Sequence, residues 1–208
     1  NGGFICTGTI LDSQYILTAA HCVTDVKGMV VLFTNSAPDG QTLGSLIRNG
    51  AYSRQVVGIN HNIDYPNTGL GSAYPHNDIG LIRFKGGIPA GFRPVTLLPP
   101  SKMAAYLKPQ TEVLIAGFGQ RSGDGVDTGV LYKNTVKVQK AYAKTVVVGE
   151  SGSSACHGDS GGPAFVSVNG KLYQWGVLSR GEPGCTSSAI YTPLTSNFFG
   201  KMEDPGSY

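Results

Sequence analysis

The sequence is poor in charged residues. Aspartate, glutamate, lysine and arginine make up 14% of its 208 residues, against about 25% in average soluble proteins. The net charge of +3 is mild, and no basic stripe is interleaved with aromatic residues, so nucleic acid is not an expected partner. No apolar run approaches the ~20 residues that span a bilayer, so no membrane partner is expected either. No leader segment is visible, and we expect the sequence to be that of a mature chain.

Cysteine is scarce as well. The four cysteines are Cys6, Cys22, Cys156 and Cys185. Because none has the C-x-x-C spacing of a zinc site, we expect no metal and no other cofactor. The four residues allow three disulfide pairings, or they could remain free thiols. Disulfides would require an oxidising compartment, and hence a secreted or otherwise extracytoplasmic protein.

Glycine and proline, by contrast, are abundant. The chain has 30 glycines and 12 prolines, and between them lie many short runs rich in Val, Ile, Thr and Tyr. This pattern is typical of an all-β sandwich or barrel, and the length allows one large domain or two modest ones. The expected strands are Phe4–Leu11, Gln14–Thr18, Val30–Phe33, Val56–Ile59, Ile79–Phe84, Glu112–Gly117, Val136–Val138, Val146–Val148, Ala164–Val168 and Leu172–Leu178.

Turn and helix signals separate these runs. Asn169-Gly170 is a strong two-residue hairpin signal. A long loop over residues 60–77 is expected to lead to Asp78. Short helical turns are expected over residues 19–22 and 102–107, and Ser196 is expected to cap a short C-terminal helix that ends at Lys201.

Two short segments carry the clearest chemistry. Residues 158–163 read Gly-Asp-Ser-Gly-Gly-Pro and place Ser160 between glycines, where the backbone can bend sharply. Residues 18–22 read Thr-Ala-Ala-His-Cys and place His21 beside a cysteine. A serine hydroxyl is a poor nucleophile until a base takes its proton, so the two segments favour nucleophilic acyl transfer.

Chain order selects among the arrangements of such a site. The G-x-S-x-G elbow of α/β-hydrolases needs an acid and a histidine after the serine, whereas all four histidines precede Ser160. The subtilisin order would need Asp12 ahead of His21, yet only one short turn and strand separate them. The remaining order, His then Asp then Ser, finds its acid in Asp78, which an apolar strand follows. Asp64 is a competitor by type, but it lies in a Tyr/Pro/Asn-rich loop without such a strand.

These segments, with Asn-Asp-Ile-Gly-Leu-Ile at 77–82, resemble the three motifs of the chymotrypsin/trypsin family of serine proteases. The resemblance covers nearly the whole chain, from Phe4 to Tyr191. It implies an all-β, chymotrypsin-like fold of two antiparallel six-stranded β-barrels with a short C-terminal helix. Residues 1–98 would form the barrel that carries the His and Asp, and residues 99–208 the barrel that carries the Ser.

The resemblance also implies a mechanism. His21 would accept the proton of Ser160 as its hydroxyl attacks a peptide carbonyl, and Asp78 would hold the imidazole. The N–H groups of Gly158 and Ser160 would bind the oxyanion, and Ser179 matches the serine that hydrogen-bonds the aspartate. The implied function is a secreted, monomeric serine endopeptidase acting on proteins or peptides through an acyl-enzyme. An activating protease and protein inhibitors would be further partners, and a catalytically silent homologue that binds proteins is the alternative.

Specificity follows one step further from the resemblance. The base of the substrate pocket would be Ser154, which cannot pair with Arg or Lys as an aspartate would, and the walls would be Gly181 and Ala189. We therefore expect cleavage after medium or large apolar residues. Arg180 replaces the family's usual tryptophan beside the pocket, and His157 would lie on its lip. The other two histidines, at 61 and 76, are expected to be loop residues with local hydrogen bonds.

Two pairings of cysteines are implied in the same way. Cys6–Cys22 would anchor the loop that carries the histidine, and Cys156–Cys185 would tie the nucleophile loop to a neighbouring strand. Closing loops of these lengths contributes roughly 3–4 kcal/mol each in the chain-entropy model.

Asp159 marks a departure from the family pattern. In the family a freed N-terminal amine pairs with this aspartate, whereas this sequence begins Asn1-Gly2-Gly3-Phe4. A buried, unpaired carboxylate costs several kcal/mol, so we expect Asp159 to find another partner or to face solvent. We also expect a zymogen-like form with a poorly formed oxyanion hole.

Overall fold

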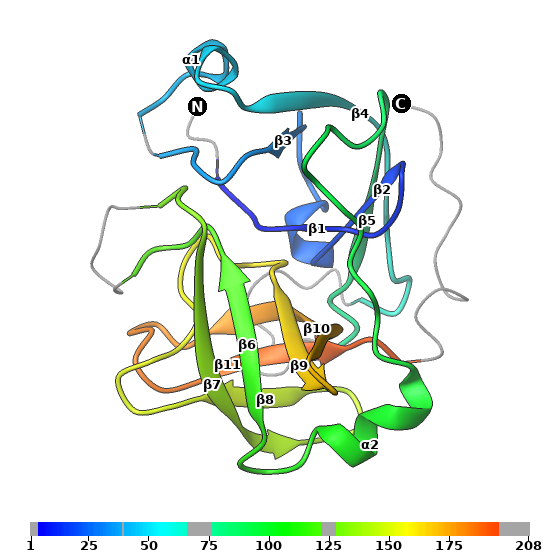
Figure 1. The fold of residues 1–208 in the computed structure, drawn as a ribbon, viewed down its shortest axis with the longest axis vertical. Coiled ribbons are helices and arrows are strands. Elements are labelled where there is room, and N and C mark those ends of the chain that lie inside the picture. The colour runs from blue at the N-terminus through cyan, green and yellow to red at the C-terminus, as the bar shows by residue number, and fades with distance from the viewer. Residues whose placement is uncertain (1–3, 39, 66–75, 122–127, 196–208) are drawn as a thin grey trace.

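The computed structural model describes residues 4–38, 40–65, 76–121 and 128–195, and the described part is built mainly of β-strands (Figure 1). The strands are β1 (Thr9–Ile10), β2 (Tyr15–Thr18), β3 (Val30–Phe33), β4 (Tyr52–His61), β5 (Gly80–Phe84), β6 (Glu112–Gly117), β7 (Tyr132–Ala141), β8 (Val146–Gly149), β9 (Pro163–Val168), β10 (Lys171–Gly181) and β11 (Ala189–Pro193). The helices are α1 (Leu43–Arg48) and α2 (Met103–Tyr106), with 3-10 turns over Ala20–Cys22 and Pro100–Lys102. The predicted C-terminal helix lies outside the described residues.

The first sheet differs from the predicted six-stranded barrel. It is a half-barrel of five antiparallel strands in the order β1-β2-β5-β4-β3. Its two edge strands do not pair, because β1 has only two residues and the chain after β3 leaves the sheet to form α1. That helix begins after Thr42, whose hydroxyl accepts the Ser45 N–H at 3.1 Å as an N-cap. The α1 helix was not predicted from the sequence.

The second sheet is the predicted six-stranded barrel. Its antiparallel strands close in the order β10-β11-β8-β7-β6-β9. Alternating residues of these strands fill the interior, among them Trp175 and Val136, both fully buried. The predicted hairpin between β9 and β10 is confirmed, since Asn169 and Gly170 have φ angles of 51° and 76°, as a type I′ turn requires.

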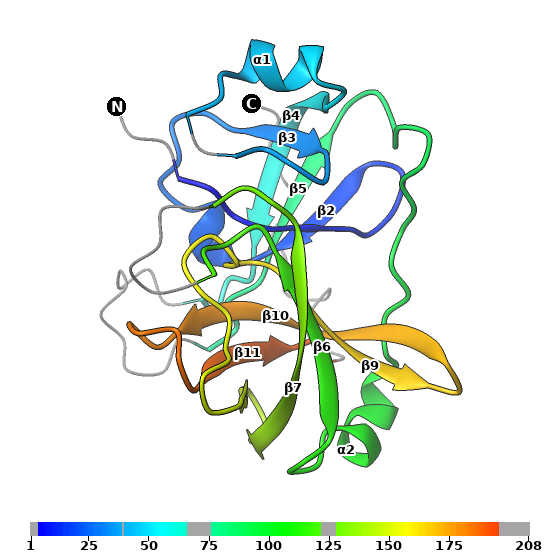
Figure 2. The same cartoon turned by 60° about the vertical axis from the view of Figure 1, so that its left-hand side comes forward.

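The two sheets share one core. Leu17 of β2 and Ile79, just before β5, belong to the same cluster of buried residues as Trp175 and Leu178 of the barrel. The connector after β5 binds both sheets, since the Val95 N–H donates to a carbonyl of β1 and the chain then pairs with β10. Figure 2 shows the two sheets stacked directly on each other. The predicted domain boundary at residue 98 falls at the end of this connector and stays a prediction.

No helix within the described ranges is long and apolar enough to cross a membrane.

Candidate active site

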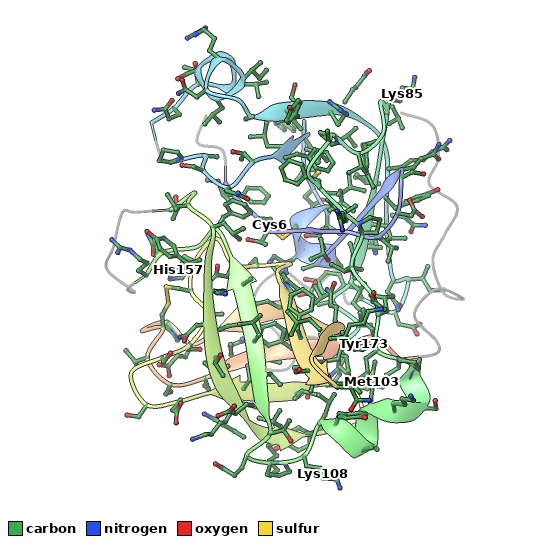
Figure 3. All side chains as sticks on the ribbon, viewed as in Figure 1. Cys6, Lys85, Met103, Lys108, His157 and Tyr173 are labelled. Carbon is green, nitrogen blue, oxygen red and sulfur yellow. A yellow bond between two sulfur atoms is a disulfide. The ribbon has the colours of Figure 1, made fainter. Side chains whose placement is uncertain are left out.

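His21 stands in the 3-10 turn that directly follows β2. Its neighbours in the turn, Ala20 and Cys22, are buried, while the His21 side chain is 17% exposed. The Cys6–Cys22 disulfide ties this turn to the chain ahead of β1, and Figure 3 shows Cys6 where the first sheet meets the barrel. The turn therefore presents the imidazole at the junction of the two sheets.

Asp78 reaches His21 because β2 and β5 are paired. Thr18 lies opposite Gly80 in that pair, and a Cβ on Gly80 would lie 2.8 Å from the Ala19 carbonyl oxygen. Only glycine allows this approach. Asn77, immediately before Asp78, adopts a φ of 59° and turns the chain out of the preceding loop. Since β4 continues to His61, that loop is shorter than predicted.

The Asp78 carboxylate is 1% exposed and accepts three hydrogen bonds. Oδ1 accepts the backbone N–H of His21 at 3.0 Å, and Oδ2 accepts its Nδ1–H at 2.8 Å. The Ser179 hydroxyl, from β10 of the barrel, donates to Oδ2 at 2.6 Å. An ionised carboxylate is an acceptor only, so Nδ1 carries the proton and Nε2 is left with a free lone pair.

Tyr65 lies near the same carboxylate. Burial raises the pKa of its hydroxyl to about 12, and the negative charge of Asp78 acts in the same direction. Its ring also contacts His61 edge-on, with the ring centres 6.4 Å apart. Tyr65 was not predicted as a site residue, because nothing in its own segment indicates that its hydroxyl lies near Asp78.

Ser160 lies in a tight loop against the first sheet. Its carbonyl accepts the Thr7 N–H at 2.8 Å, and Cys22 Sγ lies 3.7 Å from the same oxygen. Gly161 has a φ of 81°, and a Cβ there would overlap Thr18 Oγ1, only 2.1 Å away. Within the described residues no hydrogen bond joins Ser160 Oγ to His21; such bonds are often long or misaligned in unliganded sites.

Two carbonyls of the loop that carries Ser160 are held by hydrogen bonds within the barrel. The His157 carbonyl accepts the Gln120 N–H at 2.8 Å, and the Asp159 carbonyl accepts the Gly162 N–H at 2.7 Å. In a trans peptide the N–H points opposite to the carbonyl. The N–H groups of Gly158 and Ser160 therefore face away from those partners, and neither donates a hydrogen bond to any other described residue.

The Asp159 carboxylate has backbone partners. Oδ1 accepts the Gly119 N–H at 2.8 Å, and Oδ2 accepts the Cys156 N–H at 2.9 Å. Burial raises the pKa of this carboxyl, while the two N–H donors act to lower it. Gly117 and Gly119 make room for the side chain, because a Cβ on either would overlap the carboxyl group.

The predicted pocket residues fall together at one end of β10. Gly181 pairs with Ala189 of β11, and a Cβ on Gly181 would lie 2.8 Å from the Ala155 carbonyl oxygen, next to Ser154. The Ser154 hydroxyl is buried and has no hydrogen-bond partner among the described residues. The Cys156–Cys185 disulfide holds this end of the site together.

The remaining predicted residues are Arg180, which directly precedes Gly181 in β10, and the three histidines other than His21. Arg180 and His157 are exposed, and His157 lies at the outer surface where the two sheets meet (Figure 3). His61 makes one local hydrogen bond, in which its Nδ1–H donates to the Asn62 carbonyl at 3.1 Å. His76 differs from the expectation: its Nδ1 is buried and has no partner in the described part of the chain.

Glu182, which was not selected from the sequence, closes the turn that contains Cys185. Its carboxylate accepts hydrogen bonds from the hydroxyls of Thr186 and Ser187 and from the Thr186 N–H. These donors lower the pKa of Glu182 to about 2. The cluster of Cys6, His21 and Cys22 offers a metal only the His21 imidazole, because both sulfur atoms are in the disulfide.

Comparison with known proteins identifies the family. Residues 1–199 match the family model described as Trypsin. The chain belongs to the trypsin family. It is 31% identical to trypsin II-P29 of Gallus gallus, over 93% of this chain and 77% of that protein. It is 28% identical to CLIP domain-containing serine protease B10 of Anopheles gambiae, over 93% of this chain and 59% of that protein.

A third relative is the urokinase-type plasminogen activator of Gallus gallus, 28% identical over 92% of this chain and 49% of that protein. The chain thus spans only about half to two-thirds of the length of several relatives it matches. Membership of the trypsin family supports a hydrolase that acts as a serine protease and, in general, protein substrates. Homologous trypsin-family proteases are typically secreted or extracellular.

Proposed function

We propose that this trypsin-family chain is a secreted serine endopeptidase that hydrolyses peptide bonds through an acyl-enzyme. The catalytic residues are Ser160 as nucleophile, His21 as base and Asp78 as the group that orients His21. The observation that carries the proposal is the buried Asp78 carboxylate, which holds the Nδ1–H of His21 at 2.8 Å beside the Ser160 loop.

The chemistry follows from these positions. Ser160 Oγ attacks the carbonyl carbon of the scissile bond while His21 Nε2 takes the hydroxyl proton. The C–N bond then breaks, and His21 returns the proton to the departing amine, leaving the acyl group on Ser160. A water molecule attacks the ester in the same way, and the acid product leaves with the serine regenerated. Asp78 stays ionised and stabilises the imidazolium that forms in each half.

The oxyanion of each tetrahedral intermediate is assigned to the N–H groups of Gly158 and Ser160. Both are free of other described partners, and the hydrogen-bonded carbonyls of His157 and Asp159 fix the peptide planes that carry them. In this class of site one such donor is worth about 3–4 kcal/mol of barrier height.

The pocket favours an uncharged side chain. Its proposed base is the neutral Ser154, and its proposed walls are the paired residues Gly181 and Ala189, which carry small or no side chains. We propose cleavage after Leu, Met, Phe or Tyr. Profiling against a peptide library tests this, and a profile dominated by Arg or Lys would contradict it.

Asp159 carries the proposal of a precursor form. Its carboxylate accepts the N–H groups of Gly119 and Cys156, one on each oxygen, and a free amine in a cleaved form would add a charged partner to these two. A precursor would have an activating protease as a partner. We also propose that the active enzyme is a monomer and that protein inhibitors bind it. Activity measured before and after limited proteolysis tests the precursor form: equal rates would contradict it.

A fluorophosphonate probe tests the central proposal. After activation by limited proteolysis, we expect stoichiometric labelling that is lost in Ser160→Ala. Absence of labelling, both before and after attempted activation, would contradict an enzyme and favour a silent homologue that binds proteins.

A further inference from the structure

Thr7 bridges the two sheets at the nucleophile loop. It follows Cys6, precedes β1 and is 3% exposed. Its hydroxyl oxygen accepts the Phe118 N–H at 3.0 Å and donates its own hydrogen to the Gly158 carbonyl at 3.0 Å. One side-chain atom of the first sheet's segment thus binds two different loops of the barrel.

The backbone of Thr7 binds the same region. Its N–H donates to the Ser160 carbonyl at 2.8 Å, and its carbonyl accepts the Thr18 hydroxyl at 2.9 Å. Every polar group of Thr7 is therefore used. The adjacent Cys6–Cys22 disulfide fixes Thr7 to the turn that carries the proposed base.

These contacts restrain the two peptides that flank the peptide carrying the Ser160 N–H, one of the proposed oxyanion donors. The Gly158 carbonyl lies in the peptide that joins Gly158 to Asp159, and the Ser160 carbonyl lies in the peptide that joins Ser160 to Gly161. Thr7 holds both carbonyls from the same side. Gly158 has a φ of 97°. Because glycine can adopt many other backbone conformations, contacts that hold its carbonyl help to keep this one.

We propose that Thr7 is a positioning residue for the oxyanion hole, which its hydroxyl holds in place by linking Gly158 to Phe118. The expected effect on kcat rests on the proposed function, whereas the restraint of the loop by Thr7 does not. A valine at this position keeps the shape but leaves the Phe118 N–H and the Gly158 carbonyl buried without partners. A serine keeps the hydroxyl.

Thr9 provides a matched control. It is 8% exposed, and its hydroxyl also bonds across the sheets, to Gln174 Oε1 at 2.9 Å, away from the nucleophile loop. In the full-length protein we expect Thr7→Val to lower kcat about tenfold with KM within about twofold. Affinity for a peptide aldehyde, whose adduct places an oxyanion in the hole, should fall by the same factor. Thr7→Ser should stay within about twofold of the parent, and Thr9→Val should lower only the Tm.

Amide hydrogen exchange tests whether the Thr7 hydroxyl restrains the nucleophile loop, and this test does not depend on catalytic activity. The N–H groups of Asp159 and Gly162 are protected by bonds to Cys156 and Asp159, and neither contacts the Thr7 hydroxyl. In a Ser160→Ala background we expect these two amides to exchange about tenfold faster in Thr7→Val than in Thr9→Val. Equal exchange in the two variants, or an equal loss of kcat, would overturn the proposal. If the parent protein hydrolyses nothing, the proposed function fails, and the exchange still judges the role of Thr7.

Discussion

The Ser179 hydroxyl donates to Asp78 Oδ2 at 2.6 Å across the junction of barrel and half-barrel. The two residues are 101 positions apart, and both are almost completely buried. A short hydrogen bond to a buried carboxylate is among the stronger kinds. The hydrogen bond therefore fixes the orienting group of one sheet to the strand of the other that leads to the proposed substrate pocket.

Ser179→Ala should weaken both activity and stability. The substitution removes one of three donors to a buried charge, which costs about 1–3 kcal/mol of unfolding free energy. We expect kcat/KM to fall about tenfold, measured with a peptide substrate alongside urea denaturation. Ser167→Ala, at an exposed position of β9, is the control and should change neither. An unchanged kcat/KM in Ser179→Ala would show that the remaining donors suffice to hold Asp78.

Gly161→Ala should be far more harmful than the same change at Gly170. Both glycines have similar φ angles, 81° and 76°. A Cβ at Gly161 would overlap Thr18 Oγ1, whereas a Cβ at Gly170 has no atom within 4 Å. Gly170→Ala should cost about 1 kcal/mol from backbone strain alone, and Gly161→Ala should add several kcal/mol and abolish fluorophosphonate labelling. Chemical denaturation of the two variants in parallel measures the difference; equal costs would contradict the close approach.

The two disulfides should differ slightly in what they contribute. Cys6 and Cys22 are 16 positions apart, and Cys156 and Cys185 are 29 apart. The chain-entropy model gives about 3 kcal/mol for the shorter loop and about half a kcal/mol more for the longer. Replacing each pair by alanines and measuring the unfolding free energy tests this. Loss of the first pair should also reduce labelling of Ser160, because it releases both Thr7 and His21. Full labelling of that variant would contradict the coupling.

The Tyr65 hydroxyl should ionise only near pH 12 in the folded protein, and its raised pKa should stabilise the folded state at lower pH. Its pKa is raised from 10 to about 12, chiefly by burial and secondarily by Asp78. A raised pKa in the folded state stabilises the protein below the unfolded value, and this contribution is lost as the pH rises from 10 through 12. Absorbance of tyrosinate should show one step near pH 12 that is absent in Tyr65→Phe and shifts modestly downward in Asp78→Asn. A step that ignores Asp78→Asn would place Tyr65 away from the carboxylate.

Local signals carried much of the fold and the choice of site residues. The Asn169-Gly170 hairpin and the apolar strand after Asp78 depend on neighbours in the chain, so a single sequence can reveal them. The α1 helix has only six residues, too few for a helical pattern to emerge, although Thr42 was a usable capping signal.

Other features depend on contacts between distant segments. Whether the first sheet closes is decided by the length of β1 and the path after β3, which no residue type in either segment specifies. Tyr65 and Thr7 matter because of Asp78, 13 positions from the first, and Gly158, 151 positions from the second. Their own neighbours in sequence give no hint of these contacts.

The common core of the two sheets has a consequence for how the molecule can be divided. Leu17 and Ile79 are covered by barrel residues rather than by their own sheet alone. Expressing either sheet by itself would lay apolar side chains open to water, and neither fragment would retain the geometry at the junction. We therefore expect that neither sheet can be removed or replaced alone with part of the function kept, and that engineering has to retain both sheets together.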